Sequence, residues 1–309
     1  MEYKVYKLEF QGPVHFGKGS LEDSEYTFCA DTLFSALCQE ANKKGEAVLT
    51  KLYEYAKTDA LLLSDAFPYQ NDMLYLPKPM CRIEQKEDAG DSSIKKAYKK
   101  LKYIPAEEME DYLCGEYDIQ YAPDMNQIGV FDMKTVASLR GEEESVPYRI
   151  RTFLFQPDSG LYIIVGYQDK KVKELLEELL HALSFSGLGG KRASGFGRFQ
   201  VLEETLPDCI YKRLTGNGKK YMTLSVSLPR DEELEQVLEK AEYLLVKRSG
   251  FVQSTSYAKE QMRKRDLYVF KTGSCVHVKY KGDIYDVSDT VGSHAVFRYA
   301  KPMFMEVDV

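Results

Sequence analysis

The sequence of 309 residues contains no tryptophan, only four histidines and no pair of cysteines at CxxC spacing. The six cysteines stand singly, at positions 29, 38, 81, 114, 209 and 275, and no histidine lies at metal-ligand spacing from any of them. We therefore expect free thiols, no zinc site, and no other metal or cofactor.

Long apolar runs are also missing. No stretch approaches the ~18 apolar residues of a membrane helix, and the opening MEYKVYKLEF lacks the charged-then-apolar pattern of a secretion signal. These absences predict a cytoplasmic protein with no membrane partner. The net charge of −6 excludes a chain coated in positive charge. A local basic groove remains possible, because a polyanion responds to the local field.

Hydrophobic periodicity indicates how the first 205 residues are organised. The expected elements are a strand over 3–10, a helix with an N-cap at Asp31 and an end at Gly45, a helix and a strand within 52–69, a hairpin of strands 148–155 and 160–167 joined by QPDSG, a helix over 169–186 and a strand over 197–204. This order fits a ferredoxin-like βαββαβ unit, the architecture of RNA-recognition domains. Residues 80–147 are charged and poorly periodic, so we expect an insertion there, partly helical and partly mobile.

A linker from Leu206 to Gly218 precedes a second unit. Its expected elements are a strand over 220–228, a helix over 230–241 and strands over 242–254, 266–273 and 274–282. These elements indicate a second, degenerate unit of the same kind, without a strict internal repeat. The fold class predicted is α+β, with two ferredoxin-like (RRM-like) βαββαβ domains. The first domain spans 1–205, with the insertion at about 80–147, and the second spans 206–309.

The stretch GLGGKRASGFGRF, residues 187–199, carries five glycines and three cations without an acid. It leaves a helix and enters a strand, which is the wrong order for a Walker loop or a dinucleotide-binding loop, and the residue patterns of both also fail. A plain turn would not need so many glycines, since each costs ~0.5–1 kcal/mol relative to alanine. We therefore interpret it as a backbone cradle for nucleic acid, with amide N–H groups facing phosphates.

Three further groups of residues are candidates for RNA contact. The loop GPVHFGKGS (12–20) contains His15, which either contacts RNA, is simply solvated, or acts as a general base in RNA cleavage. The basic stretch 247–266 interleaves Phe251 and Tyr257 with cations, which is typical either of a single-strand binding surface or of a solvated hairpin. Arg149 and Arg151 share one face of a strand, either in a groove or exposed, and Arg298 and Lys301 are also possible groove residues.

The glycine stretch, placed between a helix and a strand, resembles the glycine-rich loop of the RAMP superfamily of CRISPR proteins. Together with CADTLFSALCQEA (29–41) and SHAVFRYAKPMFMEV (293–307), it resembles the Csm4 family, the Cas-five-like subunit of type III-A CRISPR effector complexes. The resemblance implies two ferredoxin-like domains with the insertion acting as a thumb. It also implies a non-catalytic subunit that grips the repeat-derived 5′ tag of the crRNA, docks the large polymerase-like Csm subunit and meets the backbone RAMP subunit.

We predict a set of RNA-binding residues from these stretches, with no catalytic residue and no metal ligand. They are His15, Phe16, Gly17, Lys18, Gly19, Arg149, Arg151, Gly187, Gly189, Gly190, Lys191, Arg192, Ser194, Gly195, Gly197, Arg198, Arg248, Arg263, Lys264 and Arg265. The main rival is a metal-independent RAMP endoribonuclease that processes CRISPR repeat RNA with His15 as its catalytic residue. A third possibility is an assembly scaffold whose glycine loop meets protein rather than RNA.

Overall fold

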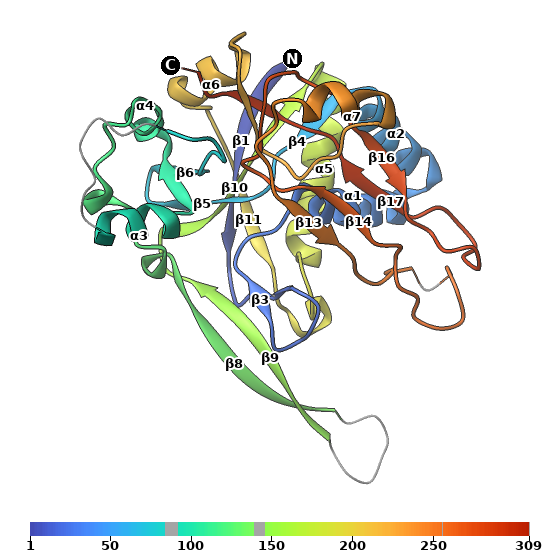
Figure 1. The fold of residues 1–309 in the computed structure, drawn as a ribbon. Helices are drawn as coiled ribbons and strands as arrows, with labels where there is room; N and C mark the ends of the chain where they lie inside the picture. Colours follow the sequence, from blue (N-terminus) through green and yellow to red (C-terminus); the bar gives the residue numbers. More distant parts are fainter. Residues whose placement is uncertain (84–91, 139–145, 255, 309) are drawn as a thin grey trace.

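The computed structural model describes residues 1–83, 92–138, 146–254 and 256–308 (Figure 1). Its strands are β1 (Glu2–Phe10), β2 (Phe16–Gly17), β3 (Ser24–Glu25), β4 (Leu61–Leu63), β5 (Phe67–Gln70), β6 (Met73–Pro77), β7 (Tyr103–Pro105), β8 (Gly129–Ser138), β9 (Val146–Phe155), β10 (Ser159–Tyr167), β11 (Phe199–Glu204), β12 (Tyr221–Thr223), β13 (Leu245–Arg248), β14 (Leu267–Phe270), β15 (Cys275–Val276), β16 (Asp283–Asp286), β17 (Phe297–Ala300) and β18 (Phe304–Glu306). Its α-helices are α1 (Ala30–Lys44), α2 (Glu46–Lys57), α3 (Ser92–Lys100), α4 (Met109–Cys114), α5 (Lys170–Ser186), α6 (Asp208–Thr215) and α7 (Asp231–Leu238). Short 3-10 turns lie at Ala106–Glu108, Ile119–Tyr121, Met125–Gln127 and Arg192–Ser194.

The main sheet is antiparallel, with strand order β11-β1-β10-β5-β6-β7, and β4 also pairs with β10. Alternate residues of β1 and β10 face opposite sides, as the period of two in a strand requires. Leu8 and Ile163 pack with α1, α2 and α5 in one core cluster, whereas Val5 and Ile164 pack with α4, α6 and β12 in the other. Strand β10 is buried along its whole length because both faces of the sheet are covered.

The two long helical stripes predicted from the sequence are confirmed. Leu33, Phe34 and Leu37 of α1 are fully buried, and so are Leu176 and Leu179 of α5. Gly45 ends α1 as expected, with its N–H bonded to the Ala41 and Asn42 carbonyls. The N-cap prediction is wrong, because Cys29 occupies that position and Asp31 lies inside the first turn.

The β9–β10 hairpin predicted from QPDSG is also wrong. Strand β9 pairs along its length with β8, from Gly129↔Phe155 to Ser138↔Val146. Strand β10 already has β1 on one side and β4 and β5 on the other, so it offers no free edge to β9. The β8–β9 ribbon instead projects from the body of the molecule (Figure 1).

The second half of the chain has shorter strands than expected. Strands β15, β12 and β18 form a small sheet, while β13–β14 and β16–β17 are separate pairs. The strand predicted over 242–254 is reduced to β13, and the one predicted over 274–282 is reduced to β15. Isolated bridges at Glu242 and Phe251 mark where pairing continues without regular strand geometry.

The insertion over 80–147 contains α3, β7, α4 and β8, and its α4 side chains pack into the second core cluster. The prediction of mobility within it falls partly on residues 84–91 and 139–145, which lie outside those described. Within the described ranges, no helix is both long enough and apolar enough to span a bilayer.

Candidate nucleic-acid interface

A groove of about 1630 Å³ opens between the two halves of the chain. Its walls come from the loop after β1, one face of α1, the glycine stretch and segments of the second half. The Lys and Arg side chains that line it are Lys18, Lys78, Lys99, Lys100, Lys102, Lys191, Arg192, Lys247, Arg248, Arg263, Lys264, Lys271 and Arg298. Against these thirteen cations, the described lining contains three acids, Glu25, Asp31 and Asp65.

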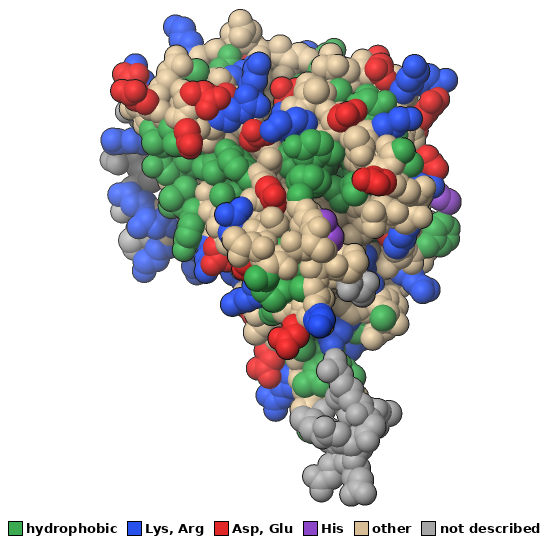
Figure 2. Space-filling model, turned by 90° about the vertical axis from the view of Figure 1, so that its right-hand side faces the viewer, with side chains coloured by type: hydrophobic (Ala, Val, Ile, Leu, Met, Phe, Trp, Pro, Cys, Tyr) green, Lys and Arg blue, Asp and Glu red, His purple; other side chains and the backbone are tan. Residues whose placement is uncertain are grey.

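The rest of the surface does not share this bias. On the face shown in Figure 2, Lys and Arg side chains are interspersed with Asp and Glu around an apolar band. The whole chain has a net charge of −6. The groove is therefore a local positive region on an acidic protein, and such a region attracts polyanions.

The glycine stretch is folded tightly against the loop that follows β1. A Cβ at Gly197 would lie 2.0 Å from the Leu188 carbonyl oxygen, and one at Gly189 would lie 2.7 Å from the His15 carbonyl oxygen. The Gly190 N–H donates to His15 O at 2.8 Å, and the Gly197 N–H donates to Pro13 O at 3.0 Å. The prediction that the loop amides face phosphates is therefore wrong for these two, because the protein already uses them.

His15 lies at the junction of three segments. Its carbonyl accepts from the glycine stretch, and its Nδ1 lies 2.7 Å from the Arg151 carbonyl of β9. Because a carbonyl can only accept, Nδ1 carries the proton in this contact. The ring is buried and lines the groove. The loop after β1 therefore lies beside the glycine stretch.

The centre of the α1 wall is an ion cluster that joins the two halves. Arg248 forms a two-point contact with the Asp31 carboxylate, Nε to Oδ2 at 3.0 Å and Nη2 to Oδ1 at 2.7 Å. Arg298 Nη1 donates to Asp31 Oδ2 at 2.6 Å. Burial alone would raise the pKa of Asp31, but Arg248, followed by Arg298, holds that pKa below its usual value. Asp31 therefore anchors two guanidinium groups instead of capping a helix.

Two other polar residues on α1 hold cations. Arg192 Nη2 donates to Gln39 Oε1 at 2.7 Å, and Lys264 Nζ lies 3.4 Å from Ser35 Oγ. Lys191, next to Arg192 in the chain, reaches across the loop to Tyr148 instead, with its Nζ 3.1 Å from the hydroxyl and 4.5 Å from the ring centroid.

The structure brings twelve of the predicted RNA-binding residues to the groove. They are His15, Phe16, Gly17, Lys18, Gly19, Gly189, Gly190, Lys191, Arg192, Arg248, Arg263 and Lys264. The other eight do not line it, namely Arg149, Arg151, Gly187, Ser194, Gly195, Gly197, Arg198 and Arg265. Among these, the Arg151 guanidinium stacks 4.4 Å from the Phe131 ring centroid, and Arg265 donates to the Asp286 carbonyl.

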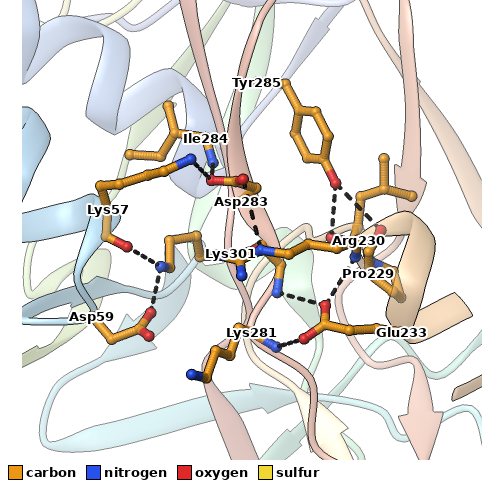
Figure 3. Close-up of polar contacts among 12 residues, drawn as sticks. Lys57, Asp59, Pro229, Arg230, Glu233, Lys281, Asp283, Ile284, Tyr285 and Lys301 are labelled. Carbon is orange, nitrogen blue, oxygen red and sulfur yellow. Dashed lines mark hydrogen bonds and ion pairs between the residues drawn. The ribbon is translucent and has the colours of Figure 1, made fainter. Parts of the chain in front are cut away.

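Two residues considered for RNA contact have structural roles instead. Tyr257 is buried in a small core with Val252 and Val296, so only Phe251 of the predicted aromatic pair faces the groove. Lys301 is fully buried, pairs with Asp59 and donates to the Lys57 carbonyl at 2.9 Å (Figure 3).

Sequence reasoning gave less weight to several lysines that the fold places in the groove. They are Lys78, Lys99, Lys100, Lys102, Lys247 and Lys271. Three of them belong to a cluster of five lysines over residues 95–102, and such a cluster is more typical of a solvated surface than of an RNA contact.

Comparison with known proteins is consistent with this arrangement. The family model of the RAMP superfamily matches residues 7–200, and the model described as the CRISPR Csm4 C-terminal domain matches residues 216–307. The "CRISPR system Cms protein Csm4" of Streptococcus thermophilus is 39% identical over 100% of both chains. The chain belongs to the Csm4 family. A second Csm4 relative, from Mycobacterium tuberculosis (strain CDC 1551 / Oshkosh), is 38% identical over 99% of this chain and 98% of its own.

Solved structures share the fold of this Csm4 family member. A chain of the Csm3-Csm4 subcomplex of a type III-A CRISPR-Cas interference complex superposes with a TM-score of 0.67, at 18% identity over 98% of both chains. A chain of the Csm1-Csm4 cassette in complex with pppApA gives a TM-score of 0.63, at 19% identity over 100% of this chain and 99% of that one. These likenesses confirm a mixed α and β fold, and the family model over residues 7–200 identifies it as the RAMP type.

Proposed function

We propose that this chain is the RNA-binding subunit of a type III-A Csm interference complex and that its groove holds the repeat-derived 5′ tag of the crRNA. The charge of the groove is the observation that carries the proposal, with thirteen cations and three acids among its described lining residues. An RNA backbone carries a negative charge at every nucleotide, so a groove of this charge and size suits it.

The strand arrangement supports the two-domain reading that goes with this function. In the first domain, β11, β1, β10 and β4 are neighbours in that order, with α1 and α5 packed on one face. This is the antiparallel order of a ferredoxin-like unit. The RAMP superfamily model ends at residue 200 and the Csm4 C-terminal model begins at residue 216, which supports a domain boundary near residue 205. The projecting β8–β9 ribbon is then the thumb of the first domain.

The partners follow from the same family. Chains of like fold occur in the Csm3-Csm4 and Csm1-Csm4 assemblies. We infer that this chain meets a backbone RAMP subunit and the large polymerase-like subunit in the same way. The surroundings of His15 support a structural rather than a catalytic role for this residue. Its ring is buried, and its Nδ1 donates to the Arg151 carbonyl.

A binding experiment tests the proposal directly. The probe is a single-stranded RNA with the repeat sequence of the host, and affinity is measured by fluorescence anisotropy over a salt series. Substituting Lys191 and Arg192 with Met removes two groove cations, so we expect the slope of log affinity against log salt to shrink by about 1.4. The melting temperature is expected to stay close to that of the wild type.

The matched control is the double variant Lys171→Met, Lys240→Met. It has the same charge change, but both lysines are exposed and neither lines the groove. An equal loss in both variants, or unchanged binding in the first, contradicts the proposal. Cleavage of the repeat RNA that disappears in His15→Ala would instead establish the endoribonuclease.

A further inference from the structure

Helix α1 presents a polar stripe to the groove on the side opposite its buried apolar residues. Asp31, Ser35 and Gln39 follow one another at a spacing of four residues, and all three line the groove. At 3.6 residues per turn and 1.5 Å per residue, such positions share one helix face at intervals of ~6 Å. The core face of the same helix carries Leu33 and Leu37, which are fully buried.

Each position of this stripe holds a cation that comes from elsewhere in the chain. Asp31 binds Arg248 and Arg298 of the second half. Ser35 meets Lys264, also of the second half, and Gln39 accepts from Arg192 of the glycine stretch. We call these four cations, Arg248, Arg298, Lys264 and Arg192, the cation ladder. The residues that hold these cations, Asp31, Ser35 and Gln39, lie about one helical turn apart along α1.

The ladder holds more positive charge than its protein partners neutralise. Asp31 is the acid among the three stripe residues, and Ser35 and Gln39 are neutral. Arg298 Nε is buried and finds no acceptor among the described residues. Burial, and then the nearby Arg298, lowers the pKa of Lys264, as expected where positive charges crowd together. A bound anion would relieve this crowding.

We propose that the ladder is a set of anion subsites that take successive phosphates of one RNA strand, which runs along α1 from Arg248 toward Arg192. The inference rests on the proposed function, and it adds a path and a register for the strand. Asp31, Ser35 and Gln39 are positioning residues, since they act through the cations that they hold. The strand therefore crosses from the second half of the chain to the glycine stretch.

The path can be tested by scanning the RNA backbone. A set of repeat-sequence RNAs is made, each with one phosphate replaced by an uncharged methylphosphonate. The full-length wild type, Lys264→Gln and Arg192→Gln are titrated with every member. Each variant is expected to bind the fully charged RNA about tenfold more weakly than the wild type does. When the phosphate that faces the substituted cation is already neutral, variant and wild type should bind equally well. We call this disappearance of the difference a coupling between the cation and that linkage.

The register is the decisive outcome. We expect Lys264→Gln and Arg192→Gln to couple to neighbouring linkages, at most one nucleotide apart. Coupling to distant linkages, or no coupling while the wild type binds RNA, overturns the ladder and leaves the proposed function standing. A wild type that binds none of the RNAs overturns the proposed function itself.

The positioning role has its own readout. Gln39→Ala keeps the charge of the ladder but removes the acceptor that holds Arg192. In this background, we expect the effect of Arg192→Gln to couple to several phosphate linkages instead of one. The slope of log affinity against log salt should stay unchanged. Gln39→Glu still holds Arg192 but neutralises its charge, so it should weaken the Arg192 coupling without spreading it over other linkages. A sharp coupling in Gln39→Ala would show that the stripe does not position the cation.

Discussion

Two polar clusters join the first half of the chain to the second, and they differ in charge balance. In the α1 wall of the groove, four cations of the ladder meet one acid, Asp31. In the network of Figure 3, Lys57 and Arg230 pair with Asp283, Lys301 pairs with Asp59, and the Glu233 carboxylate accepts the backbone N–H groups of Arg230 and Lys281. Three paired cations therefore lie among three acids. A balanced network holds two segments together. The unbalanced wall does the same and keeps positive charge available for a ligand.

The largest effect is expected from removing the acid of the unbalanced wall. Asp31→Ala leaves two guanidinium groups, one of them almost fully buried, without a counter-charge, which should lower the free energy of unfolding by about 3–5 kcal/mol. Urea denaturation measures this loss. In the balanced network, Asp59→Ala leaves one buried cation, Lys301, which keeps its bond to the Lys57 carbonyl, whereas Asp31→Ala leaves two cations without a counter-charge, so the loss should be smaller. Equal losses would remove the energetic distinction between the two clusters.

The second effect is a pH dependence at the floor of the groove. Asp65 accepts from the Ala30 and Val226 amides, yet burial raises its pKa from 3.8 to about 6. The folded protein therefore binds this proton more tightly than the unfolded chain. The stabilisation is fully present below pH 3.8 and is lost as the pH rises through about 6, by up to about 3 kcal/mol.

The variant Asp65→Asn cannot titrate at this position, so the difference in unfolding free energy between wild type and variant should change across this pH window. Asp31 has the opposite sign, since its lowered pKa makes its contribution disappear only as the pH falls below 3.8. Denaturation curves at a series of pH values separate the two. A constant difference between wild type and Asp65→Asn from pH 4 to 6 would contradict the assignment.

A third effect concerns the glycine stretch that supports Arg192. Gly197 has φ of 74°, and a Cβ there would lie 2.0 Å from the Leu188 carbonyl oxygen. Gly197→Ala should therefore destabilise the protein by about 2 kcal/mol or more and displace the loop, which weakens RNA binding. Gly12→Ala is the matched control, because nothing lies within 4 Å of its added Cβ and its φ is not positive. Similar melting temperatures for the two variants would show that the loop is not held by close packing.

The smallest effect is expected in the balanced network. Lys57→Met breaks the ion pair with Asp283, but Lys57 is 38% exposed, so the loss should be about 1 kcal/mol or less. Its RNA affinity should equal that of the wild type, whereas Arg192→Gln should bind more weakly at unchanged stability. If Lys57→Met also weakened RNA binding, the network of Figure 3 could not be purely structural.

Local pattern was enough to predict the helices that build the first half. The stripes of α1 and α5, the end of α1 at Gly45 and the strand β1 all follow from periodicity and glycine, which act over a few residues. The β9–β10 hairpin failed because the choice of strand partner depends on which edges remain free. That choice is made by the whole sheet and not by the turn.

The same division applies to the candidate site. The glycine stretch and its neighbouring loop were recognisable because their residue types are unusual. Asp31 was mistaken for a cap, since its partners Arg248 and Arg298 lie 217 and 267 residues away. Lys301 and Tyr257 looked like groove residues until the fold placed them inside the protein.

The sequence by itself determined the two long helices of the first half, the faces that they bury and that an acidic chain carries concentrated basic stretches. It did not determine every helix, because α6 (Asp208–Thr215) lies in the stretch predicted to be a linker. Only the tertiary structure decided which cations are neutralised inside the protein and which remain for a ligand. The physical reason is the separation along the chain over which each effect acts. Backbone periodicity depends on adjacent residues, whereas burial and charge pairing depend on atoms that meet only after distant segments pack together.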